Sequence, residues 1–220
     1  MAEYTPVRQP IADQMYEVLL GQFMNGSRAP GETLNIGALS RELNVSQTPL
    51  REALARLEHT GLVRREALRG YRVAPVMGRA EIVQLMDARL LLEPKLASEA
   101  ALRVTPEFLR EIRDTVIDFA DAEAGADVES ETFGLYWNAD HRFHTLIASQ
   151  AGNPFLESAY AALSGQIQRF RLFSKMGRTG LEEAVPEHEA ILAALEARDG
   201  DAAGEAMRRH VAQAMERAIV

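Results

Sequence analysis

The chain has 220 residues, of which 47 % are hydrophobic and 25 % are charged, as in an ordinary soluble globular protein of one or two domains. It contains no cysteine, which excludes disulfides and thiolate metal sites and fits a reducing compartment. No apolar run reaches the ~18 residues of a membrane span, and the N-terminus lacks the charged start and apolar core of a signal peptide. We therefore expect a cytoplasmic protein without a membrane partner.

The net charge of −8 is distributed unevenly along the chain. Residues 1–77 contain nine basic and eight acidic side chains and so carry +1, whereas residues 78–220 contain the other fifteen and twenty-four and carry −9. Only the first segment can approach nucleic acid phosphates without strong repulsion. The asymmetry predicts two domains, 1–77 and 78–220.

The first domain begins with a predicted helix over residues 11–23. Its apolar residues have helical spacing, and the face that we expect to be buried consists of Ile11, Met15, Val18 and Leu19. A loop rich in glycine and polar residues follows at 25–32. A short helix then presents Ile36, Leu39 and Leu43 on one side.

A tight turn connects this short helix to the next one. Asn44 suits a left-handed helix end, and Ser46 suits the N-cap of the following helix. That helix has a regular apolar stripe made of Leu50, Ala53, Leu54 and Leu57. Two short strands, LVRRE and YRVAPV, form a hairpin after it. The order helix, helix, turn, helix, hairpin predicts a winged helix-turn-helix.

The helix that starts after Ser46 has the features of a DNA-reading helix. Its stripe faces its own domain, and the polar side chains at its leading end are Gln47, Thr48, Arg51 and Glu52. Arg51 can contact a guanine edge or a phosphate, and Gln47 can pair with adenine. Ser46 and Thr48 can hold phosphates at the helix start. A small three-helix module with a solvated polar face would show the same pattern, so this alternative stays open.

The hairpin adds a second candidate contact with DNA. Arg69 lies at its tip beside Gly70, where it can reach the minor groove or the phosphate backbone.

The second domain is predicted to be an all-α bundle of about six helices. Helix breaks fall at glycine- and proline-containing segments, and Thr105 and Asn153 are suited to cap the helices that start at the prolines after them.

Four of the five histidines lie in this acidic domain. Asp140 and His144 are separated by one helical turn and therefore lie side by side, while His188 and His210 are on two other predicted helices. Imidazole and carboxylate together suit Zn²⁺, Ni²⁺, Fe²⁺ or Mn²⁺ better than Ca²⁺. A surface pair of Asp140 and His144, with the other histidines elsewhere, is the alternative that spacing leaves open. His141 points away from Asp140 and is expected to lie outside the site.

The run LSRELNVSQTPLREALARLEHTGLV, followed by RGYRVAP, resembles the DNA-binding domain of the GntR family of bacterial regulators, in its FadR-type branch. The resemblance implies a homodimer that binds a palindromic operator in double-stranded DNA. Two positions depart from the family pattern. Gln47 stands where arginine is usual, and Gly37 stands where some relatives have another arginine. Both departures put the usual operator sequence in doubt.

The second domain resembles the FCD ligand-binding domain of the same proteins, in four segments between Asp87 and Val211. Many members hold a divalent metal with one aspartate and three histidines. The matching residues here are Asp140, His144, His188 and His210. The resemblance implies a metal cofactor, most simply zinc, with nickel, manganese or iron as alternatives.

The FCD resemblance also implies an effector cavity that faces the metal. Arg89 would lie on a helix lining this cavity and could bind an anionic effector, with Arg169 as a weaker candidate. A structural ion pair explains Arg89 equally well, because Glu93 is one helical turn away.

Together these features predict a transcriptional regulator, in the first instance a repressor, that is controlled by a small carboxylate effector and is not an enzyme. Two alternatives remain open. A metal-dependent hydrolase would need a general base, for which Glu187 beside His188 is the candidate. In a direct metal sensor, the metal itself would be the signal.

Overall fold

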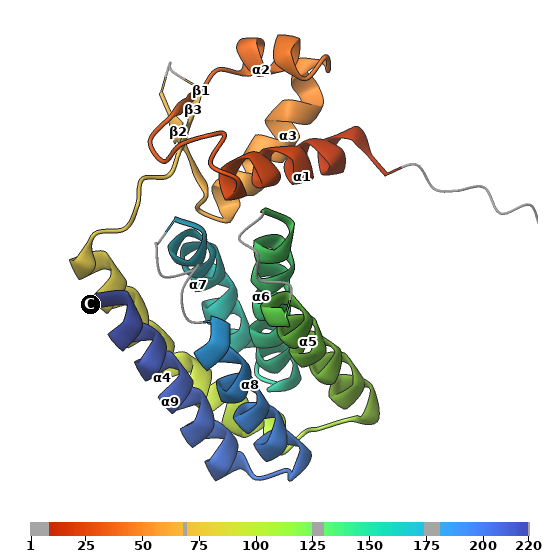
Figure 1. The fold of residues 1–220 in the computed structure, drawn as a ribbon, viewed down its shortest axis with the longest axis vertical. Helices are drawn as coiled ribbons and strands as arrows, with labels where there is room; N and C mark the ends of the chain where they lie inside the picture. Colours follow the sequence, from red (N-terminus) through yellow and green to blue (C-terminus); the bar gives the residue numbers. More distant parts are fainter. Residues whose placement is uncertain (1–8, 68–69, 125–129, 174–180, 220) are drawn as a thin grey trace, which may run out of the picture. The chain divides into compact units, whose positions relative to one another are not determined.

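The computed structural model describes residues 9–67, 70–124, 130–173 and 181–219 (Figure 1). The described residues up to Pro75 form one compact unit, and those from Val76 onward form another. The first unit is a winged helix-turn-helix, and the second is all α-helical, so the predicted fold class is confirmed. No helix in the described part of the chain is long and apolar enough to cross a membrane.

The first unit contains three helices and a small antiparallel sheet, whose strands lie in the order β1-β3-β2. Along the chain the elements are α1 (Ile11–Met24), β1 (Thr33–Leu34), α2 (Ile36–Glu42), α3 (Gln47–His59), β2 (Val63–Glu66) and β3 (Gly70–Val73). The strand β1 was not anticipated. It is only two residues long, which gives too little alternation for a pattern to be recognised.

The helix α3 packs through its predicted stripe. Leu50, Ala53, Leu54 and Leu57 are all completely buried. Asn44 adopts a left-handed conformation with φ of 51°, which terminates the helical path after α2 and allows the tight turn into α3. The helix-turn-helix is therefore built by local backbone chemistry on one side and by burial of this stripe on the other.

The predicted buried face of α1 was partly wrong. Ile11 and Val18 are 54 % and 39 % exposed, and the residues that are buried are Met15, Leu19, Leu20 and Phe23. Positions 15, 19 and 23 follow one another at steps of one turn plus about 40°, so the face that packs against α3 is rotated away from residue 18. The helix carries apolar residues on several sides, and which of them become buried depends on the element that packs against it.

The hairpin of β2 and β3 forms the wing, with Glu66 opposite Gly70 at the closed end. Gly70 has φ of +90°, and a Cβ atom at this position would lie 3.1 Å from the backbone oxygen of Leu34 in β1. The backbone conformation and the close approach both require glycine. Arg69, the predicted wing contact, lies outside the described residues.

The second unit contains six helices in its described residues: α4 (Arg79–Ala101), α5 (Pro106–Ala124), α6 (Ser130–Gln150), α7 (Pro154–Phe173), α8 (Leu181–Glu196) and α9 (Gly200–Ile219). Thr105 and Asn153 act as predicted at the starts of α5 and α7. The Thr105 hydroxyl accepts from the backbone N–H of Phe108, and the Asn153 side chain accepts from those of Phe155 and Leu156.

The helices α4 and α9 lie side by side along the bundle (Figure 1). Gly204 of α9 allows this approach, because a Cβ atom there would lie 3.1 Å from the backbone oxygen of Pro94 in α4. The apolar core of the unit draws residues from all six helices and includes Phe119 of α5 and Phe143 of α6, both fully buried.

Candidate metal centre and nucleic-acid interface

Four predicted ligand side chains converge inside the helical unit. Asp140 and His144 come from α6, His188 from α8 and His210 from α9. Each offers one ligand atom, and these atoms all lie within 4.8 Å of one another. All four side chains are buried. The surface-pair alternative for Asp140 and His144 is therefore wrong, because both residues are internal and the two distant histidines lie beside them.

The Nε2 atoms of the three histidines point into this cluster. Oδ1 of Asp140 lies 3.4 Å from Nε2 of His188 and 3.8 Å from Nε2 of His144. Within the described residues, none of the three Nε2 atoms, including that of His210, has a hydrogen-bond partner. Buried polar atoms without partners are rare, because each costs free energy unless something binds it. Three such nitrogens beside one carboxylate oxygen are what a metal site presents before the ion is added.

The opposite nitrogen of each ring lies close to an oxygen atom; for His188 and His210 this contact is a hydrogen bond, and for His144 it is a close contact with a carboxylate. Nδ1 of His144 lies 2.8 Å from the Glu93 carboxylate, and Nδ1 of His210 lies 2.7 Å from that of Glu187. Nδ1 of His188 lies 2.6 Å from the backbone oxygen of Ala184. An acceptor at Nδ1 holds the proton there and leaves the Nε2 lone pair free, which is the usual arrangement around metal-bound histidines.

Apolar packing keeps this cluster away from water. The His188 ring lies between two phenylalanine rings, with centroid distances of 4.1 Å to Phe119 and 4.5 Å to Phe143. Burial lowers the pKa of His188 to about 3, and burial together with the other histidines holds the pKa of His210 well below its usual value. Both imidazoles are therefore neutral near pH 7, as a metal ligand must be.

The donor set of three imidazoles and one carboxylate fits a first-row divalent metal such as Zn²⁺. His141, on the same helix, is not part of this group and packs near Trp137 instead. With four protein ligands of this kind, further coordination positions could accept an oxygen from a bound molecule.

Arg89, a predicted effector contact, is completely buried beside the centre. Its Nε and Nη2 atoms bind the two oxygens of Glu93 at 2.6 and 3.2 Å. Burial by itself would raise the pKa of Glu93, but Arg89 and His144 hold it well below its usual range. Arg89 therefore keeps the Glu93 carboxylate ionised next to the His144 ring.

Arg169, the weaker effector candidate, is also buried on α7. Its Nη1 atom lies 3.2 Å from Gln166 and 3.6 Å from the half-exposed Glu81 of α4.

Arg171, two residues further along α7, was not anticipated. Its guanidinium forms an ion pair with Oδ2 of Asp140, and burial lowers its pKa to about 9, so the side chain is still charged near pH 7. The only signal in the sequence was a second arginine in the same segment, and helical spacing does not show that it reaches α6.

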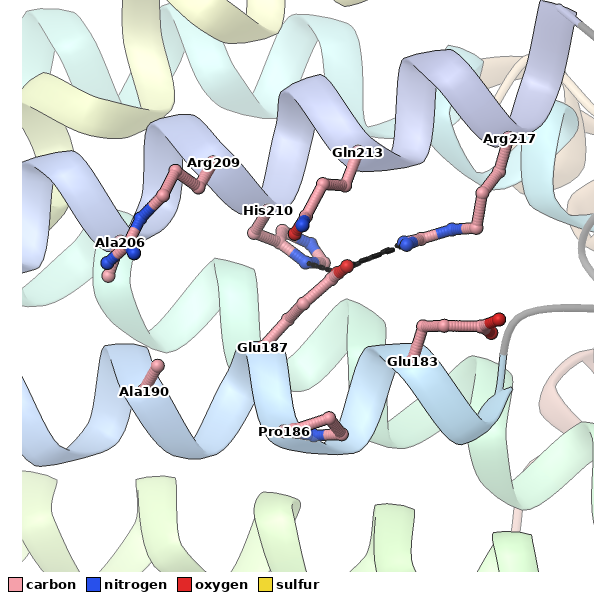
Figure 2. Close-up of a pocket in the computed structure, with 9 residues that line it drawn as sticks. All are labelled: Glu183, Pro186, Glu187, Ala190, Ala206, Arg209, His210, Gln213 and Arg217. Carbon is pink, nitrogen blue, oxygen red and sulfur yellow. Dashed lines mark hydrogen bonds and ion pairs between the residues drawn. The ribbon is translucent and has the colours of Figure 1, made fainter.

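A hollow of about 450 Å³ opens between α8 and α9 next to the centre, and Figure 2 shows its lining. The carboxylate of Glu187 is part of this lining; it accepts a hydrogen bond from Nδ1 of His210 at 2.7 Å and two from Arg217 at 2.6 and 3.0 Å (Figure 2). Glu187 is thus engaged on both sides. It is not a free base of the kind that the hydrolase alternative needs.

The leading end of α3 is solvent-exposed. Ser46, Gln47, Thr48 and Arg51 are all exposed, opposite the buried stripe. Ser46 occupies the N-cap position, although its side chain makes no capping hydrogen bond. Nη2 of Arg51 donates to the Gln47 side chain at 3.2 Å, so the two residues form one polar surface. Gly37, the other departure from the family pattern, lies in the first turn of α2.

The sequence matches two known protein families. Residues 11–73 match "Bacterial regulatory proteins, gntR family", and residues 84–213, which include all four candidate metal ligands, match "FCD domain". The HTH-type transcriptional repressor GlaR of Escherichia coli K12 is 32 % identical over 202 residues, which cover 89 % of this chain and 90 % of GlaR. The HTH-type transcriptional regulator LutR of Bacillus subtilis is 29 % identical over 85 % of this chain and 91 % of LutR.

Solved structures show the same fold. The structure of E. coli McbR/YncC has a TM-score of 0.69 at 24 % identity, and it covers 94 % of both chains. A GntR regulator from Rhodococcus sp. RHA1 has a TM-score of 0.72 at 19 % identity, covering 94 % of this chain and 97 % of the other. The sequence relatives are named transcriptional regulators and not enzymes. The chain belongs to the GntR family of bacterial regulatory proteins and is a DNA-binding transcriptional regulator with a C-terminal FCD domain.

Proposed function

We propose that this regulator is a repressor whose affinity for its operator is controlled by a small organic acid bound at a divalent-metal site. One observation carries the proposal: three buried Nε2 atoms without hydrogen-bond partners in the described residues converge on the Asp140 carboxylate. Asp140, His144, His188 and His210 would hold the ion. When bound, it would supply open coordination positions for a carboxylate or hydroxyl oxygen of the effector.

The positions of the four ligands explain how an effector could change the protein. They belong to three helices, α6, α8 and α9, so a molecule bound between them can favour one arrangement of these helices over another. The helix α9 packs along α4, and α4 begins at Arg79, only four residues after the end of the first unit. A movement of α9 therefore has a short covalent path to the DNA-binding unit.

The DNA contacts that we propose are Ser46, Gln47, Thr48 and Arg51 at the start of α3, with Arg69 and Gly70 at the wing. The exposure of the first four residues supports this assignment, since α3 buries only its opposite face. We further propose that two copies of the chain bind a palindromic operator, because a helix-turn-helix dimer reads two related half-sites. The repressor role follows the printed name of GlaR, a relative that matches along most of its length.

A gel-shift titration with the protein's own promoter tests the proposal. Protein stripped with a chelator is compared with protein reloaded with Zn²⁺, each in the presence and absence of a panel of small carboxylic acids. We expect at least one acid to change operator affinity roughly 5- to 150-fold, and only with loaded protein. If zinc alone changes operator affinity and no acid adds to it, the metal is the signal and effector control is wrong.

Two histidine variants provide a matched pair for this assay. His188→Ala removes a proposed ligand and is expected to abolish the response to the acid while leaving operator binding intact. His141→Ala removes a histidine from the same unit that lies outside the cluster, and it should respond like wild type. An equal loss of response in both variants would contradict the assignment of the metal centre.

A further inference from the structure

The arginines of the DNA-binding unit divide into two groups. Within its described residues, three of them form ion pairs with carboxylates of the same unit: Arg28, Arg56 and Arg72. The others are solvent-exposed and form no ion pair in the described part of the chain: Arg41, Arg51, Arg64 and Arg65. An arginine without a carboxylate partner can bind a DNA phosphate without first giving up an ion pair. Only one of the second group, Arg51, has been assigned to DNA so far.

Two of these exposed arginines are neighbours on β2, which is an edge strand of the sheet. Successive side chains of a strand point to opposite faces, so Arg64 and Arg65 leave the wing on different sides. Arg65 lies opposite Tyr71 in the register. The residues that share its face are all buried: Leu34, Val63, Tyr71 and Val73. This face packs on the helices of the unit, among them α3, and Arg65 is exposed because it lies near the end of the hairpin.

The other face of the wing carries Arg64, Glu66 and Arg72. The Glu66 carboxylate accepts hydrogen bonds from Nε and Nη2 of Arg72 at 2.6 and 3.2 Å, and Arg64 lies directly opposite Arg72. This face therefore points away from the helices and contains a carboxylate that offsets part of its positive charge. The face that carries Arg65 has no acidic side chain among its described residues.

We propose that Arg65 binds a DNA phosphate next to the base pairs that α3 reads, and that Arg64 does not. This inference rests on the proposed position of the DNA at the leading end of α3. A duplex held there lies on the α3 side of the wing, which is the side from which Arg65 projects. The planar guanidinium can donate two parallel hydrogen bonds to one phosphate. Such a contact fixes the position of the duplex and carries no sequence information, so Arg65 differs in its role from Arg51.

Titrations of two neighbouring variants test the proposal. Arg65→Gln and Arg64→Gln each remove one positive charge from β2, and both are compared with wild type on the protein's own promoter and on a random duplex of equal length. We expect Arg65→Gln to bind both duplexes about tenfold more weakly at about 50 mM salt, and to lower the slope of log affinity against log salt by about 0.9. Arg64→Gln should stay within about threefold of wild type, with an unchanged slope.

Three results would overturn the proposal. Wild-type binding by Arg65→Gln would show that this side chain does not contact DNA. Equal losses in the two variants would mean that the net charge of the wing matters and the face does not. A loss confined to the promoter fragment would make Arg65 a residue that reads bases.

Ethylation interference on the promoter fragment locates the phosphate. At least one position where ethylation weakens binding of the wild-type protein should have no effect on binding of Arg65→Gln, because the contact is already absent. Arg64→Gln should give the wild-type pattern. If Arg65→Gln also gives the wild-type pattern, the proposed contact does not exist.

Arg65→Lys covers the case in which the glutamine variant does not fold. Lysine keeps the charge and loses the paired hydrogen bonds, so the salt slope should equal that of wild type while affinity falls only a few-fold. A slope lowered by about 0.9 in this variant would contradict the proposal. Failure of this inference is distinct from failure of the proposed reading helix. If Arg51→Ala loses operator binding and Arg65→Gln does not, only the contact of Arg65 is wrong.

Discussion

Glu187 accepts a hydrogen bond from Nδ1 of His210 at 2.7 Å, although the two residues are 23 positions apart and belong to different helices. The same carboxylate receives two bonds from Arg217. Arg217 thus holds the Glu187 carboxylate in place, and Glu187 keeps the proton of His210 on Nδ1. Glu187 and Arg217 are not proposed metal ligands, yet together they determine which nitrogen of His210 faces the candidate metal centre.

Glu187→Gln should therefore weaken zinc binding by roughly 10- to 100-fold, the usual effect of losing a carboxylate behind a histidine ligand. Competition with a fluorescent chelator measures this change. Glu183→Gln is the matched control, since Glu183 lies one turn earlier on α8, lines the same hollow and is exposed. Equal zinc affinities for the two variants would show that the carboxylate behind His210 is unimportant.

Zinc should stabilise the second unit against heat. A ligand that binds only the folded state at 1,000 times its Kd adds about 4 kcal/mol, which corresponds to a rise of roughly 10 °C in Tm for a domain of this size. Differential scanning calorimetry with and without EDTA measures the shift. In Asp140→Asn the shift should shrink to a few degrees or vanish, whereas in His141→Ala it should persist. If zinc does not change the Tm of the wild-type protein, the proposed metal centre is contradicted.

Arg51→Ala should abolish specific operator binding, because Arg51 is exposed at the leading end of α3 and, among the described residues, its side chain hydrogen-bonds only to Gln47. Arg56→Ala on the same helix is the control. Arg56 pairs with Asp13 and lies 4.5 Å from the centre of the Tyr16 ring. Its loss should cost about 0.5 to 1 kcal/mol of stability and leave operator preference unchanged. Footprinting distinguishes the two, and a normal footprint with Arg51→Ala would mean that another segment reads the operator.

Gln47→Arg restores the residue that is usual in the family at that position. We expect it to shift operator preference and to steepen the dependence of log affinity on log salt by about one unit, as one new phosphate contact would. Titrations at several salt concentrations, on wild-type and altered operators, measure both effects. An unchanged salt slope together with unchanged preference would place residue 47 away from the DNA.

Gly70→Ala should destabilise the wing by about 1 to 2 kcal/mol, because alanine is strained at φ of +90° and its Cβ would press on the Leu34 backbone oxygen. The midpoint of the first unit's thermal unfolding transition measures this loss of stability. Gly78→Ala provides a comparison, since nothing lies within 4 Å of a Cβ atom there and its φ is negative. If both variants unfold like wild type, Gly70 is not required by the wing's backbone.

Several features of this protein follow from its sequence because they are local. The apolar stripe of α3, the left-handed turn at Asn44 and the caps at Thr105 and Asn153 each depend on residues within about one or two helical turns. The pairing of Asp140 and His144 on one helix face is local in the same sense. Resemblance to the FCD domain, and not spacing, brought His188 and His210 into the same predicted set.

Tertiary structure decided everything that depends on which helices meet. Helix periodicity shows that a residue lies on a face, but not which partner covers that face, so the exposure of Ile11 and Val18 on α1 and the contact between Arg171 and Asp140 could not be read from spacing. From the sequence, Arg89 could have bound either an effector or Glu93. Only the packing of the helices shows that Arg89 pairs with Glu93 and that both lie buried beside His144. The sequence by itself determined the helices, their caps and the residue types of the candidate metal centre. The packing of α4, α6, α7, α8 and α9 decided which charges stand beside that centre, because long-range contacts fix a side chain's neighbours and local backbone preferences do not.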